Sequence, residues 1–446
     1  MRETRSTTVE ELIAQENLTS RQLQALTGRS QPWVSARLQE LGDRVVRLRS
    51  GRSVRYALAR PAFGSDDRIP VWTVDSCGSN TWTLDVRPIS SGRFALETAS
   101  GTSRLWLGDR ADGYYEGLPW FLSDLRPQGF IGRAIAMSLT KRGAFFPADP
   151  RDWNTSHTAY YLLANGDDLP GNLQVGHQAG LRVRRPPIGR RSSEYPDLAE
   201  AALQGESPGS SAGGEQPKFA VYSAERSAHV IVKFSPNGND GIVDRWRDVL
   251  VTEHEAARVL RSISGIPAGE ARLFSSAGRL FLESDRFDRK GEHGRLSMHS
   301  LQAVDAEFVG DGADWNRVMK GLLDRGLVSH EHTMDVRLLQ AFGRCIGNTD
   351  MHLGNLSLAI DGDFFRLSPV YDMCSMCLAP GQSALLPVEQ LPAWRDSEPS
   401  TMDADFPPDM KDALLALCRE FWNGVAKHEH ASREFATFAV KRVRSI

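Results

Sequence analysis

Residues 347–355 read GNTDMHLGN, and this run says more about the architecture and chemistry of the chain than any other part of it. Asp350 stands five residues before Asn355, and Tyr371-Asp372-Met373 supplies a second aspartate shortly afterwards. Transfer of a phosphoryl group needs one carboxylate to orient the attacking hydroxyl, and an amide and another carboxylate to hold magnesium against the phosphates. We therefore predict that Asp350 is the general base and that Asn355 and Asp372 are Mg²⁺ ligands.

The residues before this loop predict a strongly apolar helix over 336–346. A rigid helix that ends at the loop would hold the general base in a fixed place. His352 follows Asp350 by two residues. We expect His352 to make hydrogen bonds at the nucleotide site rather than to abstract a proton.

Upstream, a glycine loop leads into two short apolar strands. Gly213 and Gly214 precede a first pattern at residues 219–222 and a second at 229–233, which ends in Lys233. Glycine backbone can approach a polyphosphate because no side chain stands in the way. The order of these elements predicts a loop that covers phosphates and a lysine that binds them.

A helical pattern follows, and one of its acidic residues should pair with the lysine. Glu253 shares a face with apolar residues, so we expect it to turn inward to Lys233. The register of Glu255 points with Arg258 towards solvent, which makes Glu255 the less favoured candidate.

Residues 279–283 predict a strand that runs into a turn where adenine could bind. Asp285 and Phe287 in that turn are candidates for nucleotide contacts, with Phe287 stacking or packing on the base. The alternative, which the sequence leaves open, is that Phe287 belongs to the core and Asp285 is a turn residue with satisfied hydrogen bonds.

The N-terminal segment differs from the rest of the chain in charge. Residues 1–60 hold eleven arginines, no lysine and six acidic residues, a net charge of +5, whereas the whole chain carries −3. Apolar residues over 7–41 recur at steps of three and four, which predicts three short helices. Gly28 can make a tight turn before the third helix, and Ser30 can cap it.

Residues 45–58 then predict a β-hairpin with arginines at its tip. The combination is typical of a winged helix-turn-helix, whose third helix enters the major groove of double-stranded DNA while the wing touches its backbone. The alternative is a small protein-docking domain with a solvated arginine face. The residues that we expect near base edges or phosphates are Gln31, Trp33, Ser35, Arg37, Arg49 and Arg52.

Five motifs occur together in one order: GGxQPKF at 213–219, VIVK at 230–233, DRFDR at 285–289, NTDxHxxN at 348–355 and YDMxS at 371–375. Over about residues 70–440 the chain thereby resembles the HipA-type serine/threonine kinases, which are toxins of bacterial toxin–antitoxin systems. The fused N-terminal domain looks most like the YjjJ branch of that family. The resemblance implies a small subdomain followed by a large, mainly helical one, use of ATP with Mg²⁺, and phosphorylation of serine or threonine in a protein substrate.

The resemblance also implies control by autophosphorylation of a serine in the glycine loop. Counted back from Lys218, that serine falls at Ser211, with Ser210 adjacent. A phosphate there would add about −2 charge to a loop that should lie over the phosphates of ATP, so repulsion should expel the loop. Relatives attack aminoacyl-tRNA synthetases, and a separate antitoxin is a possible partner.

We therefore expect an α+β protein of four parts: a winged helix-turn-helix at 1–62, a HipA-like N-terminal subdomain at 68–180, a mobile linker with the start of the glycine loop at 181–212, and a kinase domain at 213–446. A small antiparallel sheet is expected over 70–110. The segment 182–211 is rich in Arg, Pro, Ser and Gly, which predicts a surface segment without regular structure.

Composition limits the class of protein. Hydrophobic residues at 41% and charged residues at 24% are ordinary for globular proteins, and no run is long or apolar enough for a signal peptide or a membrane span. The five scattered cysteines favour a reducing cytoplasm over a disulfide-rich secreted protein.

Other clusters are explained without function. Cys374 and Cys377 lack a second pair to complete a metal site, so we expect them to be buried beside Asp372. The segments 330–332 and 428–430, both His-Glu-His, are expected to be solvated.

The main hypothesis is a cytoplasmic ATP-dependent serine/threonine kinase with its own DNA-binding domain, acting as a growth-inhibiting toxin. Two rivals remain. A transcription regulator that only senses nucleotide would show no transfer from labelled ATP. A metal-dependent DNase would nick plasmid without ATP, through Asp350.

Overall fold

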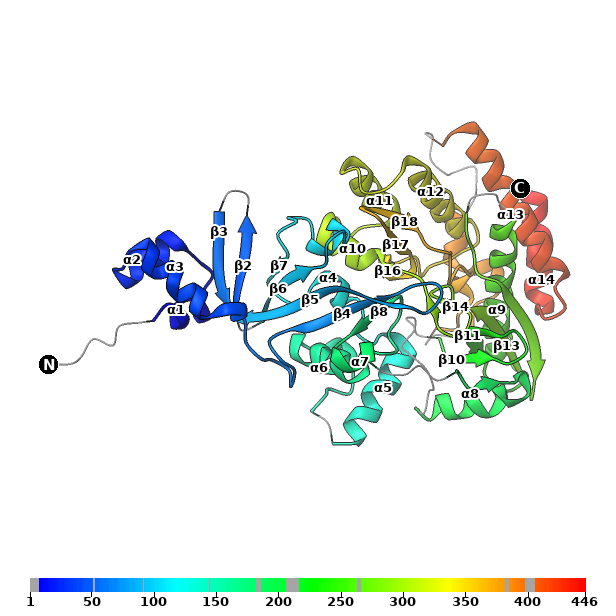
Figure 1. The fold of residues 1–446 in the computed structure, drawn as a ribbon. Helices are drawn as coiled ribbons and strands as arrows, with labels where there is room; N and C mark the ends of the chain where they lie inside the picture. The colour runs from blue at the N-terminus through cyan, green and yellow to red at the C-terminus, as the bar shows by residue number, and fades with distance from the viewer. Residues whose placement is uncertain are drawn as a thin grey trace. The chain divides into compact units, whose positions relative to one another are not determined.

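The computed structural model describes residues 8–50, 53–90, 92–143, 145–181, 186–205, 216–262, 266–381, 385–397 and 406–446. The chain divides into two units (Figure 1). Met1–Asp75, Ser79–Arg126 and Arg151–Arg184 form the first, and Ser76–Gly78, Pro127–Pro150 and Arg185–Ile446 form the second. Across the described ranges, no helix combines the length and the apolarity that a membrane crossing requires.

The first unit begins with three short helices and a small sheet of strand order β1-β3-β2. Thr8 and Thr19 form capping boxes at the starts of the first two helices, and Gly28 ends the second in the left-handed conformation at φ 67°. Ser30 is the N-cap residue of the third helix, as predicted, although its side chain makes no capping hydrogen bond. The bounds are α1 Val9–Gln15, β1 Leu18–Thr19, α2 Ser20–Thr27, α3 Gln31–Glu40, β2 Val45–Ser50 and β3 Ser53–Leu58.

Apolar residues hold these elements together at the predicted periodicity. The three helices and the hairpin share one core, made of Val9, Ile13, Leu18, Leu23, Val34, Leu38 and Leu58. The opposite side of the β2–β3 hairpin packs on the next sheet of the unit, through Val46, Leu48, Ala57, Ala59, Ile89 and Ala95. The hairpin therefore buries apolar side chains on two sides, while Arg47 and Arg49, which alternate with Val46 and Leu48 along β2, are exposed.

The second sheet of this unit is antiparallel, in the order β7-β6-β5-β4-β8, and it confirms the sheet expected over 70–110. Arg87 is buried within it and donates to Glu97 at 2.8 Å, to Asp67 at 3.1 Å and to the carbonyl of Asp43 at 2.8 Å. The strands are β4 Ile69–Val74, β5 Asn80–Ser90, β6 Arg93–Thr98, β7 Tyr114–Tyr115 and β8 Leu173–Val175. The helices are α4 Trp120–Ser123, α6 Thr155–Asn165 and α7 His177–Leu181.

The second unit contains a five-stranded sheet of order β12-β13-β11-β10-β9, antiparallel except for the β9–β10 pair. Its strands are β9 Gly189–Arg190, β10 Lys218–Ser223, β11 Ala228–Phe234, β12 Ala271–Ser276 and β13 Arg279–Asp285. Alternate side chains point to opposite faces of a strand. On one face Phe219, Val232 and Phe281 pack with α8, Tyr195–Leu203. On the other, Leu280 and Leu282 pack with α9, Gly241–Arg261.

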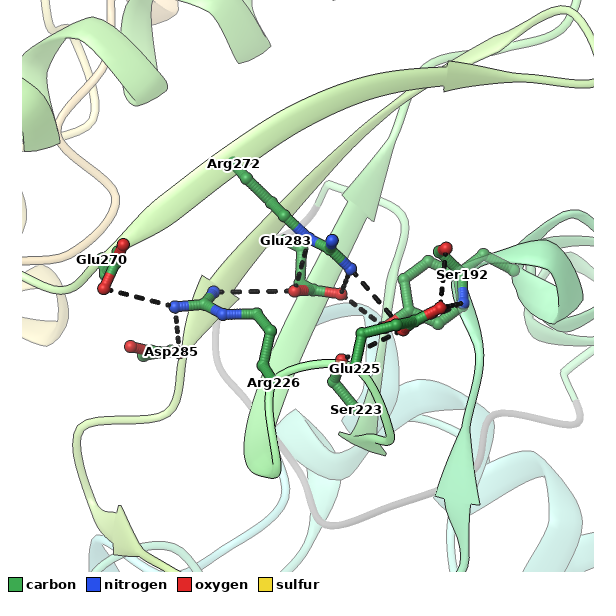
Figure 2. A network of polar contacts seen from close by, with 9 residues as sticks. Ser192, Ser223, Glu225, Arg226, Glu270, Arg272, Glu283 and Asp285 are labelled. Carbon is green, nitrogen blue, oxygen red and sulfur yellow. Dashed lines mark hydrogen bonds and ion pairs between the residues drawn. The ribbon is translucent and has the colours of Figure 1, made fainter.

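Helix α8 corrects the prediction that 182–211 lacks regular structure, as far as residues 186–205 are concerned. The low density of large apolar residues misled the prediction, because Tyr195 with two alanines is enough to cover the sheet. The Tyr195 hydroxyl donates to Glu283 at 2.5 Å, and Arg272 donates to the same buried carboxylate at 2.8 and 3.0 Å. Figure 2 shows Glu283 between Arg272 and Arg226, and Glu225 beside Ser192 at the start of this segment.

The rest of the second unit is mainly helical, with a small antiparallel sheet β16-β17-β18. Its largest buried side chains, among them Trp315, Phe342, Phe421 and Trp422, come from α11, α12 and α13. The helices are α5 Gly129–Lys141, α10 Leu301–Phe308, α11 Trp315–Asp324, α12 His330–Cys345, α13 Pro408–Lys427 and α14 Arg433–Ser445. The strands are β14 Arg289–Lys290, β15 Gly294–Arg295, β16 His299–Ser300, β17 Ser357–Asp361 and β18 Phe364–Leu367.

Candidate active site

Lys233 lies near the end of β11, on the face of the sheet that α9 covers. β11 pairs with β13 so that Lys233 is opposite Leu282, which packs with α9. Directly opposing residues on neighbouring strands point to the same face. On the other neighbouring strand, β10, Lys218 is opposite Lys233. Two buried lysines therefore point to the same face of the sheet.

Two carboxylates, from Glu253 and Asp372, contact the ammonium of Lys233. Nζ donates to both carboxylate oxygens of Glu253, at 2.6 and 2.7 Å, and to Oδ1 of Asp372 at 2.6 Å. Burial would lower the pKa of Lys233, but the charges of Asp372 and Glu253 outweigh it and raise this pKa. Burial likewise would raise the pKa of Asp372, but Lys233 and Lys218 lower it to about 2. The lysine and Asp372 are therefore both charged at neutral pH.

The expected contact between Glu253 and Lys233 is present in the structure. The expected exposure of Glu255 is wrong, because only 4% of the residue is accessible to solvent. Glu255 does pair with Arg258, at 2.8 Å, but only the arginine is half-exposed and the glutamate stays buried. Helix α9 thus carries two buried glutamates on different sides, and periodicity alone could not find the second because α13 covers it.

The loop that holds Asp350 begins where α12 ends, as the apolar pattern over 336–346 predicted. Gly347 adopts φ 73°, and a Cβ there would lie 2.4 Å from the ring of Trp394 and 2.7 Å from Sγ of Cys377. Asn348 is buried, and its side-chain oxygen accepts from the backbone amide of Asp350 at 3.0 Å. The position of Asp350 therefore depends on a left-handed glycine and a buried amide just before it.

Asn355 closes the same loop onto Asp350. Its Nδ2 donates to the carbonyl oxygen of Asp350 at 2.7 Å and to the carboxylate at 3.3 Å. Nδ1 of His352 accepts from the amide of Gly354 at 3.0 Å, and Nε2 lies 3.8 Å from the Asp350 carboxylate. His352 thus shapes the short turn Leu353–Asn355, in keeping with a hydrogen-bonding rather than a basic function.

Asp372 approaches from a second loop. Its backbone has φ 53°, a conformation that non-glycine residues seldom adopt and that is found mainly at constrained positions. The Tyr371 hydroxyl donates to the carbonyl of Gly354 at 2.9 Å, and the amide of Asn348 contacts the sulfur of Met373 at 3.6 Å. The two loops are therefore bonded to each other on both sides of Asp372.

The oxygen atoms of Asp350, Asn355 and Asp372 are of the kind that magnesium takes as ligands. Carboxylate and amide oxygens are the protein ligands that Mg²⁺ prefers, and the loops bring two carboxylates and one amide. Asn355 spends its NH₂ group on Asp350, so Oδ1 is the atom that it can offer a cation. Asp372 binds Lys233 through Oδ1 and can offer Oδ2.

The hinge candidates already have protein partners. Asp285 ends β13 and lies 2.9 Å from Arg226, which also faces Glu283 at 3.5 Å (Figure 2). The ring of Phe287 stacks on Tyr371, with centroids 5.4 Å apart. A contact of either residue with adenine stays a prediction.

Several predicted positions lie outside the described residues, namely Gly213, Gly214, Ser210, Ser211 and Arg52. Cys374 is buried next to the Asp372 loop and Cys377 is half-buried, and both are free thiols, as expected. Lys218 was missed as a charged neighbour of the site. The strand register could have revealed it, since a hairpin that turns at about residue 225 places 218 opposite 233.

The predicted DNA contacts lie on or near α3 and the hairpin. Gln31, Ser35 and Arg49 are exposed. Trp33 is half-buried against the core, with the guanidinium groups of Arg29 and Arg37 each 5.5 Å from its ring centre. Arg37 also pairs with Glu40.

Comparison with known proteins assigns the family. Residues 65–184 match the family model of the YjjJ-like toxin middle domain, and residues 210–428 match that of the HipA-like C-terminal domain. The chain is 36% identical to the toxin YjjJ of Escherichia coli K12 over 414 residues, which cover 91% of this chain and 89% of that protein. This chain belongs to the YjjJ-like toxins. The resemblance predicted from the five motifs is thereby confirmed.

The fold of this YjjJ-like toxin resembles a solved HipA. The HipA of Shewanella oneidensis MR-1, determined with HipB and operator DNA, matches with a TM-score of 0.55 and 16% identity over 84% of this chain and 96% of that one. The α+β architecture of the HipA type is confirmed at the level of fold. At this identity the likeness shows the fold alone, and it agrees with the match of residues 210–428 to the HipA-like C-terminal domain.

Proposed function

We propose that this YjjJ-like toxin is an ATP- and Mg²⁺-dependent serine/threonine protein kinase. The observation that carries the proposal is the bonding of Lys233 to both Glu253 and Asp372, at 2.6 Å each, next to a loop in which Asn355 is bonded to Asp350. An active kinase site requires a lysine paired with a helical glutamate and, beside that pair, an aspartate that binds magnesium.

In this mechanism the chain binds the nucleotide, orients the substrate hydroxyl and accepts one proton. Lys233, held by Glu253, would bind phosphate oxygens of the nucleotide. Asp350, 46% exposed and tied to Asn355, would orient the substrate hydroxyl and accept its proton at a carboxylate oxygen. Asn355 and Asp372 would hold magnesium, which when bound neutralises charge on the phosphates. Asp285, Phe287 and His352 are proposed to contact the nucleotide, and Gly213 and Gly214 to cover its phosphates.

The test is transfer of labelled phosphate from ATP, with wild type, Asp350→Asn and Lys233→Met compared. Full activity of Asp350→Asn would overturn the proposal. Phosphoproteomics after expression of wild type beside Asp350→Gln would identify the protein substrate, for which an aminoacyl-tRNA synthetase is the first candidate. Transfer to no protein, with nucleotide still bound, would favour a nucleotide-sensing regulator.

Autophosphorylation in the glycine loop is proposed to restrain the enzyme. Ser211 or Ser210 would receive the phosphate, and about two negative charges so close to the phosphates of ATP would oppose nucleotide binding. Mass spectrometry tests this. Phosphate that persists on the loop of a Ser210→Ala/Ser211→Ala double variant would refute the assignment.

We also propose that residues 1–62 form a winged helix-turn-helix that binds double-stranded DNA. The support is the three-helix and hairpin arrangement together with a net charge of +5 over residues 1–60. Gln31, Ser35 and Arg37 would face base edges or phosphates, Trp33 would set the position of the arginines beside it, and Arg49 and Arg52 would contact backbone.

The HipA of S. oneidensis was solved with HipB and operator DNA, so a DNA site and a separate antitoxin are both reasonable partners here. Binding of the full chain to duplex DNA should weaken steeply with salt, because each neutralised phosphate releases counterions. A flat salt response would refute the electrostatic contact.

The remaining proposed boundaries are 68–180 and 213–446 for the two kinase subdomains, with 181–212 between them. The proposed location is the cytoplasm.

A further inference from the structure

His254, Glu255 and His428 form a cluster where α9 meets α13 and the turn after it, outside the site described above. Oε1 of Glu255 lies 3.3 Å from Nδ1 of His254 and 3.9 Å from Nε2 of His428. One ligand atom from each of the three residues falls within 4.8 Å of the other two. Two segments more than 160 residues apart in sequence therefore bring three metal-ligating groups to one point.

We propose that this cluster binds one transition-metal ion, of which Zn²⁺ is the best fit. Two imidazoles and one carboxylate are a common ligand set for Zn²⁺, with the fourth position open to water. Bonds of about 2.0–2.1 Å in a tetrahedron separate the ligand atoms by roughly 3.3–3.4 Å. The contact with His254 already has this length, whereas the 3.9 Å contact of His428 is about 0.5 Å longer, so the ring of His428 would have to move towards Glu255 and His254.

The surroundings favour a cation at this point. Glu255 is buried, and its two carboxylate oxygens have different partners. Arg258 bonds to Oε2 of Glu255, whereas both histidines face Oε1. The oxygen between the histidines is thus the one that a metal would share.

Binding costs two hydrogen bonds. The first joins Nδ1 of His254 to Oε1 of Glu255 at 3.3 Å, and the metal would replace its proton. Nδ1 of His428 accepts from the backbone amide of His430 at 3.2 Å. A metal at Nε2 requires the proton of the neutral ring to sit on Nδ1, so this hydrogen bond is given up. At 3.2 Å it is at the long end of the usual range, and the coordinate bonds to the metal replace it.

The site would fasten α9 to the turn between α13 and α14. Asp248, seven residues before Glu255 and therefore on the same side of α9, already accepts from the amide and hydroxyl of Ser432, both at 2.7 Å. Gly424 lets α13 approach, since a Cβ there would lie 1.8 Å from the Glu255 carboxylate. A metal ion would add a second attachment at the C-terminal half of the helix.

The burial of His428, whose side chain is only 13% exposed, corrects the expectation that residues 428–430 are merely solvated. It also has a consequence that depends on the proposed kinase function. Glu253 lies on α9 immediately before the cluster and holds Lys233. Fixing the helix at 254–255 would hold that pair in place, so metal occupancy would regulate nucleotide binding.

The experiment uses the full chain, freed of metal with a chelator and titrated with Co²⁺ and then Zn²⁺ in excess Mg²⁺, without nucleotide. We expect one equivalent of Co²⁺ to bind with the intense visible absorption of a low-coordinate ion, Zn²⁺ to displace it, and Zn²⁺ to raise the melting temperature. His254→Gln and His428→Gln should each weaken binding by at least about 10-fold, since even supporting residues of metal sites contribute that much.

His332→Gln is the matched control, because His332 is also a half-buried helical histidine beside a carboxylate, Asp335, at 3.6 Å. It should bind metal as wild type does. Equal affinity of the wild type and both cluster variants would overturn the proposal. So would X-ray absorption of the wild-type Zn²⁺ complex that shows no imidazole ligands, a measurement that needs no variant to fold. Neither readout involves ATP, so failure of the metal site and failure of the kinase assignment are distinguishable.

Discussion

Replacing Lys233 with methionine tests whether the charged cluster is built for the site. The ammonium of Lys233 donates to both oxygens of the Glu253 carboxylate, whose side chain is 9% exposed. Removing one partner of a buried ion pair costs about 3–5 kcal/mol, because the remaining charge is left unpaired. Asp372 is 21% exposed and also feels the charge of Lys218, so it should add little.

At roughly 2 °C for each kcal/mol in a large domain, Lys233→Met should lower the melting temperature by about 6–10 °C. The double variant Lys233→Met/Glu253→Gln should recover part of the loss, because the unpaired charge is gone. Differential scanning calorimetry without nucleotide measures both. Lys320→Met is the control, since Lys320 forms only a surface pair with Asp324 and should change little.

Two results would refute this reasoning. A fall of less than about 2 °C for Lys233→Met would mean that Glu253 does not depend on the lysine for compensation. A double variant less stable than Lys233→Met would mean that Glu253 stabilises the fold through other partners. Either would remove the physical basis for assigning the pair to phosphate binding.

Three further predictions follow from single side chains. Asp350→Asn should lower phosphotransfer by about 10²–10⁴-fold, measured with labelled ATP, and leave the melting temperature unchanged because the carboxylate is half-exposed. Gly347→Ala should destabilise the chain in urea unfolding by at least 1–3 kcal/mol, on the order of the cost of a strained φ, since the new Cβ would also meet the ring of Trp394 at 2.4 Å; a neutral effect would contradict the geometry. Burial raises the pKa of Asp248 to about 6 despite two hydrogen bonds from Ser432, so the folded state keeps a proton that the unfolded state releases near 3.8. The free energy of unfolding should therefore fall by roughly 2 kcal/mol as pH rises from 4 to 6, and urea unfolding of Asp248→Asn should lack this slope.

Local patterns in the sequence were sufficient for much of the architecture. The three- and four-residue steps over 7–41 gave three helices, the turn at Gly28 and the hairpin after it, because these depend on contacts between near neighbours. The apolar run over 336–346 gave the helix that ends at the Asp350 loop for the same reason. Helix α8 escaped detection because its few apolar residues become significant only against the sheet that they cover.

The same division holds for the candidate site. Sequence order and motif composition determined which residues to consider, including the choice of Glu253, because a helix face is a local property. Only the tertiary structure decided that Lys233, Glu253 and Asp372 meet, that Lys218 lies beside them, and that Glu255 is buried with His254 and His428. Each of these depends on strand register or on packing between segments distant in the chain. A short stretch of sequence does not contain both partners of such a contact and therefore cannot predict it.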